Sequence, residues 1–182
     1  DIGGGTTGIT VIALAGIVCD QSIRVAGDEF TADIMEALRR YHSLLIGERT
    51  AEQIKIQVGA AMKDIDNPPD DYAVNGRDLV TGIPKQILVS YQEIAEALDK
   101  SIFKIEEAIL KALEQTPPEL AADIYRRGLY ITGGGALLRG LDKRLANKIK
   151  LPVHVADDPL KSVVRGTGIA LKNYSKYPFV MR

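Results

Sequence analysis

Apolar residues near the start of the chain fall in two short runs, and these runs predict β-strands. Residues 9–14 and 17–25 are rich in Ile and Val and are separated by Ala15-Gly16. This pattern favours two antiparallel strands joined by a tight turn. Together with a strand that would end at Asp1, they predict a meander.

The next apolar positions recur at spacings of three and four, which is the period of a helix. They place one apolar face on a helix over residues 29–45. A second helix is expected to begin after Thr50, because Thr50 and Gln53 have the spacing of a capping box.

Ser90 and Glu93 have that spacing too, and they open the longest predicted helix. Six apolar residues form a single stripe along it: Ile94, Leu98, Ile102, Ile105, Ile109 and Leu113. Pro117-Pro118 ends this helix, because a proline disfavours helical backbone in the residue before it.

Strand and helix signals alternate from residue 64 to residue 171. A loop with two prolines and four aspartates covers residues 64–71 and precedes two short predicted strands at 72–74 and 86–89. Beyond the long helix, the expected elements are helix 119–126, strand 129–131, helix 136–148, strand 153–155 and helix 159–171. Such alternation predicts an α/β fold with a sheet flanked by helices.

The same pattern divides the chain into two regions. Strand-rich and glycine-rich segments at 1–26 and 93–182 are predicted to form a core subdomain. Residues 27–92 are predicted to form a smaller inserted α+β subdomain. The tail from Tyr174 to Arg182 alternates aromatic and polar residues, and both a folded-back and a loose conformation are compatible with it.

Composition excludes several classes of function. The 182 residues include 23 Lys and Arg against 24 Asp and Glu, so no basic field is present to hold nucleic acid. One cysteine and two histidines cannot build a disulfide framework or a zinc cluster. The longest apolar stretch, 9–19, is shorter than the about 20 residues that a membrane-spanning helix needs.

A glycine-rich turn at the start of the chain is the first candidate site. In the run from Asp1 to Thr7, Gly3, Gly4 and Gly5 leave backbone N–H groups free to bind an anion such as phosphate. Asp1 is a candidate to hold Mg²⁺ through water, and Thr6 and Thr7 offer hydroxyls to phosphate or to an attacking water. A plain glycine-rich hairpin is the alternative interpretation.

A second glycine cluster, formed by Gly133, Gly134 and Gly135, follows a predicted strand and is expected to open a helix. The start of a helix favours negative charge, although tight packing explains an isolated turn equally well. Two such clusters, each at a strand end, predict a nucleotide held between two loops.

Several segments in order give the chain a specific resemblance: DIGGGTT, GDEF, GERTAEQIK, PPELAADI, ITGGGALLRGLD and VADDPLKSVVRGTGIAL. They resemble the second half of the MreB family of bacterial actin-like proteins over almost the whole chain. The resemblance implies half of an actin-like ATPase fold, related to ribonuclease H, with a core subdomain of the IIA type and an insert of the IIB type.

The resemblance also implies roles for individual residues. Gly4 and Gly5 would lie near the β- and γ-phosphates of ATP, and Thr6 would orient the attacking water. Glu52 and Lys55 match a pair that flanks the adenine and ribose, although an ordinary surface ion pair has the same spacing. The three glycines at 133–135 match the loop under the adenosine.

The function implied by the resemblance is that of a filament-forming cytoskeletal protein. ATP and Mg²⁺ would be its cofactors, and its protomers would stack head to tail, with the tip of the insert as a contact surface. The filaments would lie in the cytoplasm at the inner face of the cell membrane and organise cell-wall synthesis with wall-elongation and membrane-anchoring proteins. Membrane contact would be indirect or through the other half.

Two features set this chain apart from the family pattern. Gly8 stands where an acidic residue is common. The chain opens directly into the glycine turn, so we expect a longer protein whose other half carries the first phosphate loop and further catalytic groups. The full-length protein would be a slow ATPase, and the fragment alone is expected to be inactive. Half of a sugar or acyl kinase, or of a chaperone-type ATPase, is the alternative.

Overall fold

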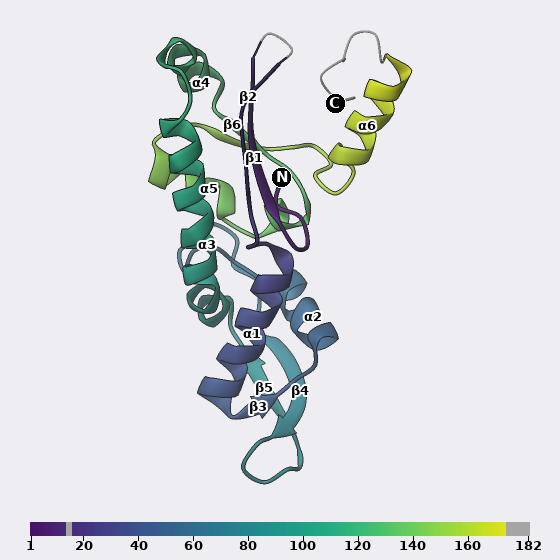
Figure 1. Cartoon of the computed structure of the whole chain (residues 1–182). Helices are drawn as coiled ribbons and strands as arrows, with labels where there is room; N and C mark the ends of the chain where they lie inside the picture. The colour runs from purple at the N-terminus through teal and green to yellow at the C-terminus, as the bar shows by residue number, and fades with distance from the viewer. Residues whose placement is uncertain (14–15, 174–182) are drawn as a thin grey trace.

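The computed structural model describes residues 1–13 and 16–173. Its first half contains β1 (Thr7–Ala13), β2 (Gly16–Ile23), α1 (Gly27–His42), β3 (Leu44–Leu45), α2 (Glu48–Val58), β4 (Tyr72–Asp78) and β5 (Pro84–Val89). Its second half contains α3 (Tyr91–Glu114), the 3₁₀ turn η1 (Pro118–Leu120), α4 (Ala121–Arg127), β6 (Leu129–Ile131), the 3₁₀ turn η2 (Gly134–Leu137), α5 (Leu141–Ile149), β7 (Val153–Val155) and α6 (Ser162–Lys172). The α/β prediction is confirmed (Figure 1).

The strands form three small sheets. β1 pairs with β2 in antiparallel fashion, and β6 pairs with β7 in parallel. β3, β4 and β5 form a separate antiparallel sheet, at the opposite end of the molecule in Figure 1. Ile2 lies between the first two sheets, because it bridges Thr7 and its N–H donates to the carbonyl of Thr132 at 2.8 Å.

A groove of about 1030 Å³ lies beside Ile2, between β1 and β6. Its lining is mainly aliphatic and includes residues of α3 and α4, among them Ile105, Ile109 and Ile124. The antiparallel hairpin and the parallel pair therefore border one apolar space.

Two predicted helix boundaries in the first half are wrong. The helix expected over 29–45 ends at His42, because Ser43 adopts a left-handed conformation with φ of 50° and the chain turns into β3. The next helix begins at Glu48 after Gly47, so Thr50 lies within its first turn and caps nothing.

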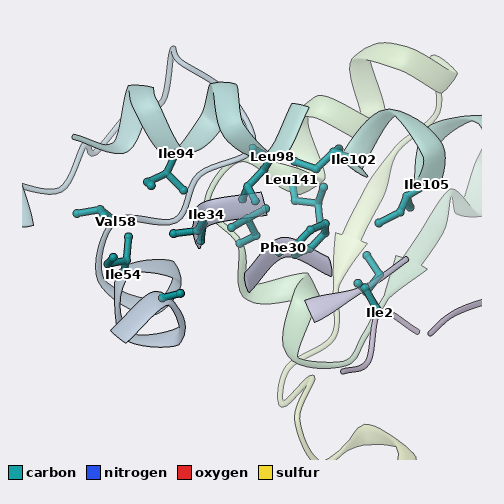
Figure 2. Packing of buried hydrophobic residues seen from close by; sticks show 14 of the residues in the cluster. Ile2, Phe30, Ile34, Ile54, Val58, Ile94, Leu98, Ile102, Ile105 and Leu141 are labelled. Atoms are coloured by element: carbon teal, nitrogen blue, oxygen red, sulfur yellow. The ribbon is translucent and has the colours of Figure 1, made fainter. Parts of the chain in front are cut away.

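The capping box predicted for the longest helix is confirmed. The Ser90 hydroxyl accepts from the Glu93 N–H at 3.3 Å, and the Ser90 N–H donates to the Glu93 carboxylate at 2.9 Å. The apolar stripe of α3 packs against α1 and enters a single core cluster (Figure 2). Phe30, Leu98 and Leu141 bring α1, α3 and α5 into that cluster.

An ion pair ties α5 to α3 beside this core. Arg144 Nε donates to Glu106 Oε1 at 2.6 Å, and Arg144 Nη1 donates to the carbonyl of Ala61 at 3.0 Å. The Glu106 side chain is 5% exposed and that of Arg144 16%. The pair thus connects α3, α5 and the segment that follows α2.

The helix expected over 136–148 is replaced by a short turn and a later helix. The glycine cluster opens η2, and α5 begins only at Leu141. Gly140 has φ of 74°, which breaks the helical path between them. The second glycine loop therefore does not lie at the start of an α-helix, and the helix-dipole argument for it fails.

The C-terminal part ends in α6, which buries none of its residues and is set apart from the body in Figure 1. Within residues 1–13 and 16–173, each helix is either too short or too polar to span a lipid bilayer. The tail 174–182, the last residue of the first predicted strand, Leu14, and the first residue of the predicted turn, Ala15, lie outside the described residues. The division into subdomains 1–26 with 93–182 and 27–92 stays a prediction.

Candidate functional site

The first glycine loop is a tight turn closed by backbone hydrogen bonds. The Gly3 N–H donates to the carbonyl of Thr6 at 3.0 Å, and the Gly8 N–H donates to that of Asp1 at 2.8 Å. Gly4, Gly5 and Thr6 are exposed, and no acceptor for their N–H groups exists within the described part of the chain. These three N–H groups are therefore available to an anion.

The start of α1 is attached to the same loop. The N–H groups of Gly27 and Asp28 donate to the carbonyls of Gly3 and Gly4, at 3.1 and 2.8 Å. The Asp28 carboxylate lies close by, because a β-carbon added to Gly5 would be 3.6 Å from its Oδ2. Sequence reasoning assigned Asp28 no role, although the GDEF segment marked its position.

The second glycine loop meets the first at Ile2. The Gly135 N–H donates to the carbonyl of Ile2 at 2.9 Å, while Ile2 donates to Thr132. A β-carbon on Gly133 would lie 2.4 Å from Asp1 Oδ1, and one on Gly135 would lie 2.2 Å from Ile2 Cγ2. The two predicted loops are thus in contact, and close packing accounts for Gly133 and Gly135.

Gly134 is different from its neighbours in this loop. It is exposed, and the nearest atom to an added β-carbon would be Leu160 Cδ2 at 3.3 Å. Because Leu160 is itself a largely exposed side chain, packing does not demand glycine here. Among the three, Gly134 is the position where contact with a ligand would be the reason for glycine.

The two threonines of the first loop have different surroundings. The Thr7 side chain is buried, and its hydroxyl donates to the carbonyl of Val25 at 2.6 Å. This geometry favours a structural role for Thr7, as a brace between β1 and the segment that leads into α1. Thr6 is exposed, so its hydroxyl remains open to a ligand.

Glu52 and Lys55 form an ion pair on α2 that also reaches α1. Lys55 Nζ lies 2.6 Å from Glu52 Oε2 and donates to the carbonyl of Gly27 at 2.8 Å. Thr31 joins the cluster, because its hydroxyl accepts from Lys55 at 3.0 Å and donates to Glu52 at 3.1 Å. Sequence reasoning missed Thr31, which is one helical turn beyond Gly27.

This cluster borders an open groove between α1 and α2. The groove has a volume of about 950 Å³, and Asp28, Thr31 and Glu52 line its end near the first glycine loop. The Lys55 side chain is 16% exposed and that of Glu52 45%. The carboxylate is therefore the more accessible partner, while the ammonium group is held between the two helices.

A magnesium ion would find the carboxylate of Asp1 at the first loop, in addition to that of Asp28 beside Gly5. Asp1 is exposed and lies against Gly133, where the two loops meet. Mg²⁺ commonly uses one or two carboxylates together with water and substrate phosphates. Within residues 1–13 and 16–173, no group of three His, Cys, Asp or Glu side chains forms a metal cage. The site fits a metal that arrives with a nucleotide.

Comparison with known proteins identifies the family. The model of the MreB/Mbl protein family matches residues 1–178. The chain is 49% identical over 178 residues to the cell shape-determining protein Mbl of Bacillus subtilis, and 47% identical over 175 residues to the cell shape-determining protein MreB of Escherichia coli. These matches cover 98% and 94% of this chain but only 53% and 49% of the relatives.

Solved structures agree with this assignment. MreB5 of Spiroplasma citri bound to ADP has a TM-score of 0.92 at 41% identity, over 97% of this chain and 53% of that protein. The MamK double helical filament has a TM-score of 0.71 at 24% identity, over 88% and 49%, and shows the shared fold. The chain spans about half the length of these relatives. With its family model matched over nearly all its residues, the chain belongs to the MreB/Mbl family of actin-like proteins.

Proposed function

We propose that this chain is the nucleotide-binding half of an actin-like, filament-forming protein that determines cell shape by organising cell-wall synthesis. The observation that carries the proposal is the junction at Ile2, which holds the two glycine loops together. Because free N–H groups line one loop and an exposed glycine lies in the other, a nucleotide could bridge them.

In this proposal, each end of an ATP molecule has its own contacts. Gly4, Gly5 and Thr6 bind the phosphates, with Thr6 also orienting the attacking water, and Asp1 holds Mg²⁺ through water. The exposed backbone at Gly134 lies under the base. When bound, Mg²⁺ supplies charge that offsets the negative phosphate oxygens.

Glu52 and Lys55 are proposed to contact the nucleoside. The Glu52 carboxylate is a suitable acceptor for the ribose hydroxyls, because it is the more exposed member of the pair and borders the groove. Lys55 fixes that carboxylate and links it to the start of α1.

Two relatives support nucleotide binding and self-association as proposals. The MreB5 structures are bound to AMPPNP and to ADP, and MamK forms a double helical filament. Head-to-tail stacking does not close on itself and therefore produces a fibre. The filaments are proposed to lie at the inner face of the cell membrane, with wall-elongation and membrane-anchoring proteins as partners.

Hydrolysis is proposed to require the other half of the protein. Catalysis of phosphoryl transfer depends on positioning groups around the γ-phosphate, and the loops described here occupy one side of it. The chain alone is therefore expected to bind nucleotide weakly and to hydrolyse none.

The test uses the full-length protein with Mg-ATP. Binding is measured by titration, and polymer by light scattering. Lys55→Met is expected to weaken binding about tenfold, since it removes charged hydrogen bonds that hold the nucleoside site. Lys63→Met is the matched control, because Lys63 also pairs with a glutamate, Glu96 on α3, but its side chain is exposed and lies beyond the C-terminal end of α2.

Three results would contradict the proposal. Absence of Mg-ATP binding in the wild-type protein would exclude the nucleotide site. Equal effects of the two lysine variants would remove Lys55 from it. Phosphorylation of a small molecule without any polymer would favour the kinase alternative.

A further inference from the structure

The C-terminal end of α2 is capped by a side chain from a distant part of the sequence. Arg139 Nη1 donates to the carbonyls of Ile56 and Gly59, at 3.2 and 3.4 Å. The carbonyls of a helix's last turn lack partners within the helix, and their partial negative charge favours a cation. Arg139 supplies both a hydrogen-bond donor for these carbonyls and a positive charge at the end of α2.

The backbone of Arg139 is attached to the same segment. Its carbonyl accepts from the Ala61 N–H at 2.8 Å, and residues 60 and 139 form a parallel bridge. Leu138 lies against the helix end, because a β-carbon added to Gly59 would be 3.0 Å from Leu138 Cδ1. Side chain and backbone thus fix the end of α2 to the segment that follows η2.

These contacts complete a closed series of hydrogen bonds around the proposed nucleotide site, which links the first glycine loop, α1, α2 and the second glycine loop in turn. The first glycine loop binds the start of α1, and Lys55 joins α1 to α2. Arg139 joins the end of α2 to the segment after the second glycine loop, and Ile2 joins that loop to the first. Arg139 is the side chain that contacts the last turn of α2 itself, while Arg144 holds the following segment through the carbonyl of Ala61.

We propose that Arg139 is a positioning residue for nucleotide binding, which sets the separation between the Glu52–Lys55 pair and the second glycine loop. The inference rests on the proposed nucleotide site. Glu52 and Lys55 lie on α2 within two turns of its capped end. Movement of that end would shift both side chains relative to Gly134, while the first loop would keep its own closing hydrogen bonds.

The planar guanidinium is suited to this task. Arginine can direct several N–H groups at neighbouring carbonyls with little loss of conformational freedom, whereas lysine carries a compact ammonium on a flexible stem. Arg139→Lys therefore keeps the positive charge at the helix end but loses most of the planar arrangement of hydrogen-bond donors. Arg139→Met loses both.

The experiment measures Mg-ATP affinity and amide hydrogen exchange in the full-length protein. Arg139→Met is expected to weaken Mg-ATP binding about tenfold, as for loss of hydrogen bonds from a charged group. Arg139→Lys is expected to weaken it less. In the absence of nucleotide, amides of residues 56–61 should exchange faster in both variants, while the buried amides of α3 should keep their protection.

Arg126→Met is the matched control. Arg126 is an exposed arginine that also donates to a helical carbonyl, that of Ala122 at 3.3 Å, but it lies on α4. This variant should leave Mg-ATP affinity and exchange at 56–61 unchanged.

The possible outcomes separate the inference from the proposed function. Unchanged affinity in both Arg139 variants would overturn it. So would faster exchange throughout α3, or loss of fold in both variants, because Arg139 would then hold the whole fold rather than the site. If the wild-type protein bound no Mg-ATP, the proposed function and the inference that rests on it would both fail, and faster exchange confined to 56–61 would then show only that Arg139 caps α2.

Discussion

Gly133 provides a sharp test of the junction between the two glycine loops. It has φ of 83° and ψ of 170°, a backbone region that is essentially restricted to glycine and that costs an alanine about 1–3 kcal/mol. An added β-carbon would also lie 2.4 Å from both Asp1 Oδ1 and the carbonyl oxygen of Ile2, and such overpacking costs about 1–3 kcal/mol. Gly133→Ala should therefore lower the free energy of unfolding by about 2–6 kcal/mol.

Variants of the two neighbouring glycines separate the cost of the backbone conformation from the cost of overpacking. Gly135→Ala has no left-handed φ and meets Ile2 Cγ2 at 2.2 Å, so it should cost the packing share of about 1–3 kcal/mol. Gly134→Ala meets only the exposed Leu160 side chain at 3.3 Å, and its stability should change by less than about 0.5 kcal/mol.

Urea denaturation of the full-length protein without nucleotide, followed by far-UV circular dichroism, ranks the three variants. The expected order of destabilisation is Gly133→Ala, then Gly135→Ala, then Gly134→Ala. Equal stability of the Gly133 and Gly134 variants would refute the geometry of the junction. If Gly134→Ala weakened Mg-ATP binding without any loss of stability, the ligand role of that position would gain independent support.

Three further predictions concern the rest of the fold. Ser90→Ala should cost about 1 kcal/mol in thermal or urea denaturation, because it removes the capping box of α3; no change would contradict the cap. Glu106→Leu should cost about 1–3 kcal/mol in the same assay, since Arg144 loses its buried carboxylate and keeps only that of the exposed Asp99, at 2.8 Å, and a neutral result would exclude this pair as a brace. N–H groups of the β4–β5 turn and Lys85 lower the pKa of Asp78 from 3.8 to about 2, so its contribution to stability is present above pH 3.8 and is lost as the pH falls towards 2. An NMR titration of the Asp78 carboxyl tests this value, and an ordinary pKa would contradict the turn geometry.

Local patterns predicted most elements of this fold. The apolar stripe of α3 and its capping box depend on residues three or four apart, so the sequence displays them directly. Two boundary predictions failed where a single residue left the helical conformation. Ser43 and Gly140 do so with positive φ, and at position 43 nothing in the residue type indicates it.

The candidate site was predicted only in part, because the sequence displays short motifs directly but does not display contacts between distant residues. Both glycine loops and the Glu52–Lys55 pair are visible as short motifs, and the structure brings the two loops into contact. The contacts of Arg139 with the end of α2 link residues about 80 positions apart, and no local pattern encodes them. Burial of Thr7 was also hidden, because its partner Val25 is 18 residues away.

The groove between β1 and β6 has a practical consequence for handling this chain. Within the described residues, β1 and β6 each pair with one strand, and Ile2 bridges them only at one end of the groove. Unpaired strand edges beside an aliphatic surface readily recruit other chains. A preparation of residues 1–182 alone should therefore tend towards disordered aggregates, and turbidity from such material would be a misleading measure of filament assembly.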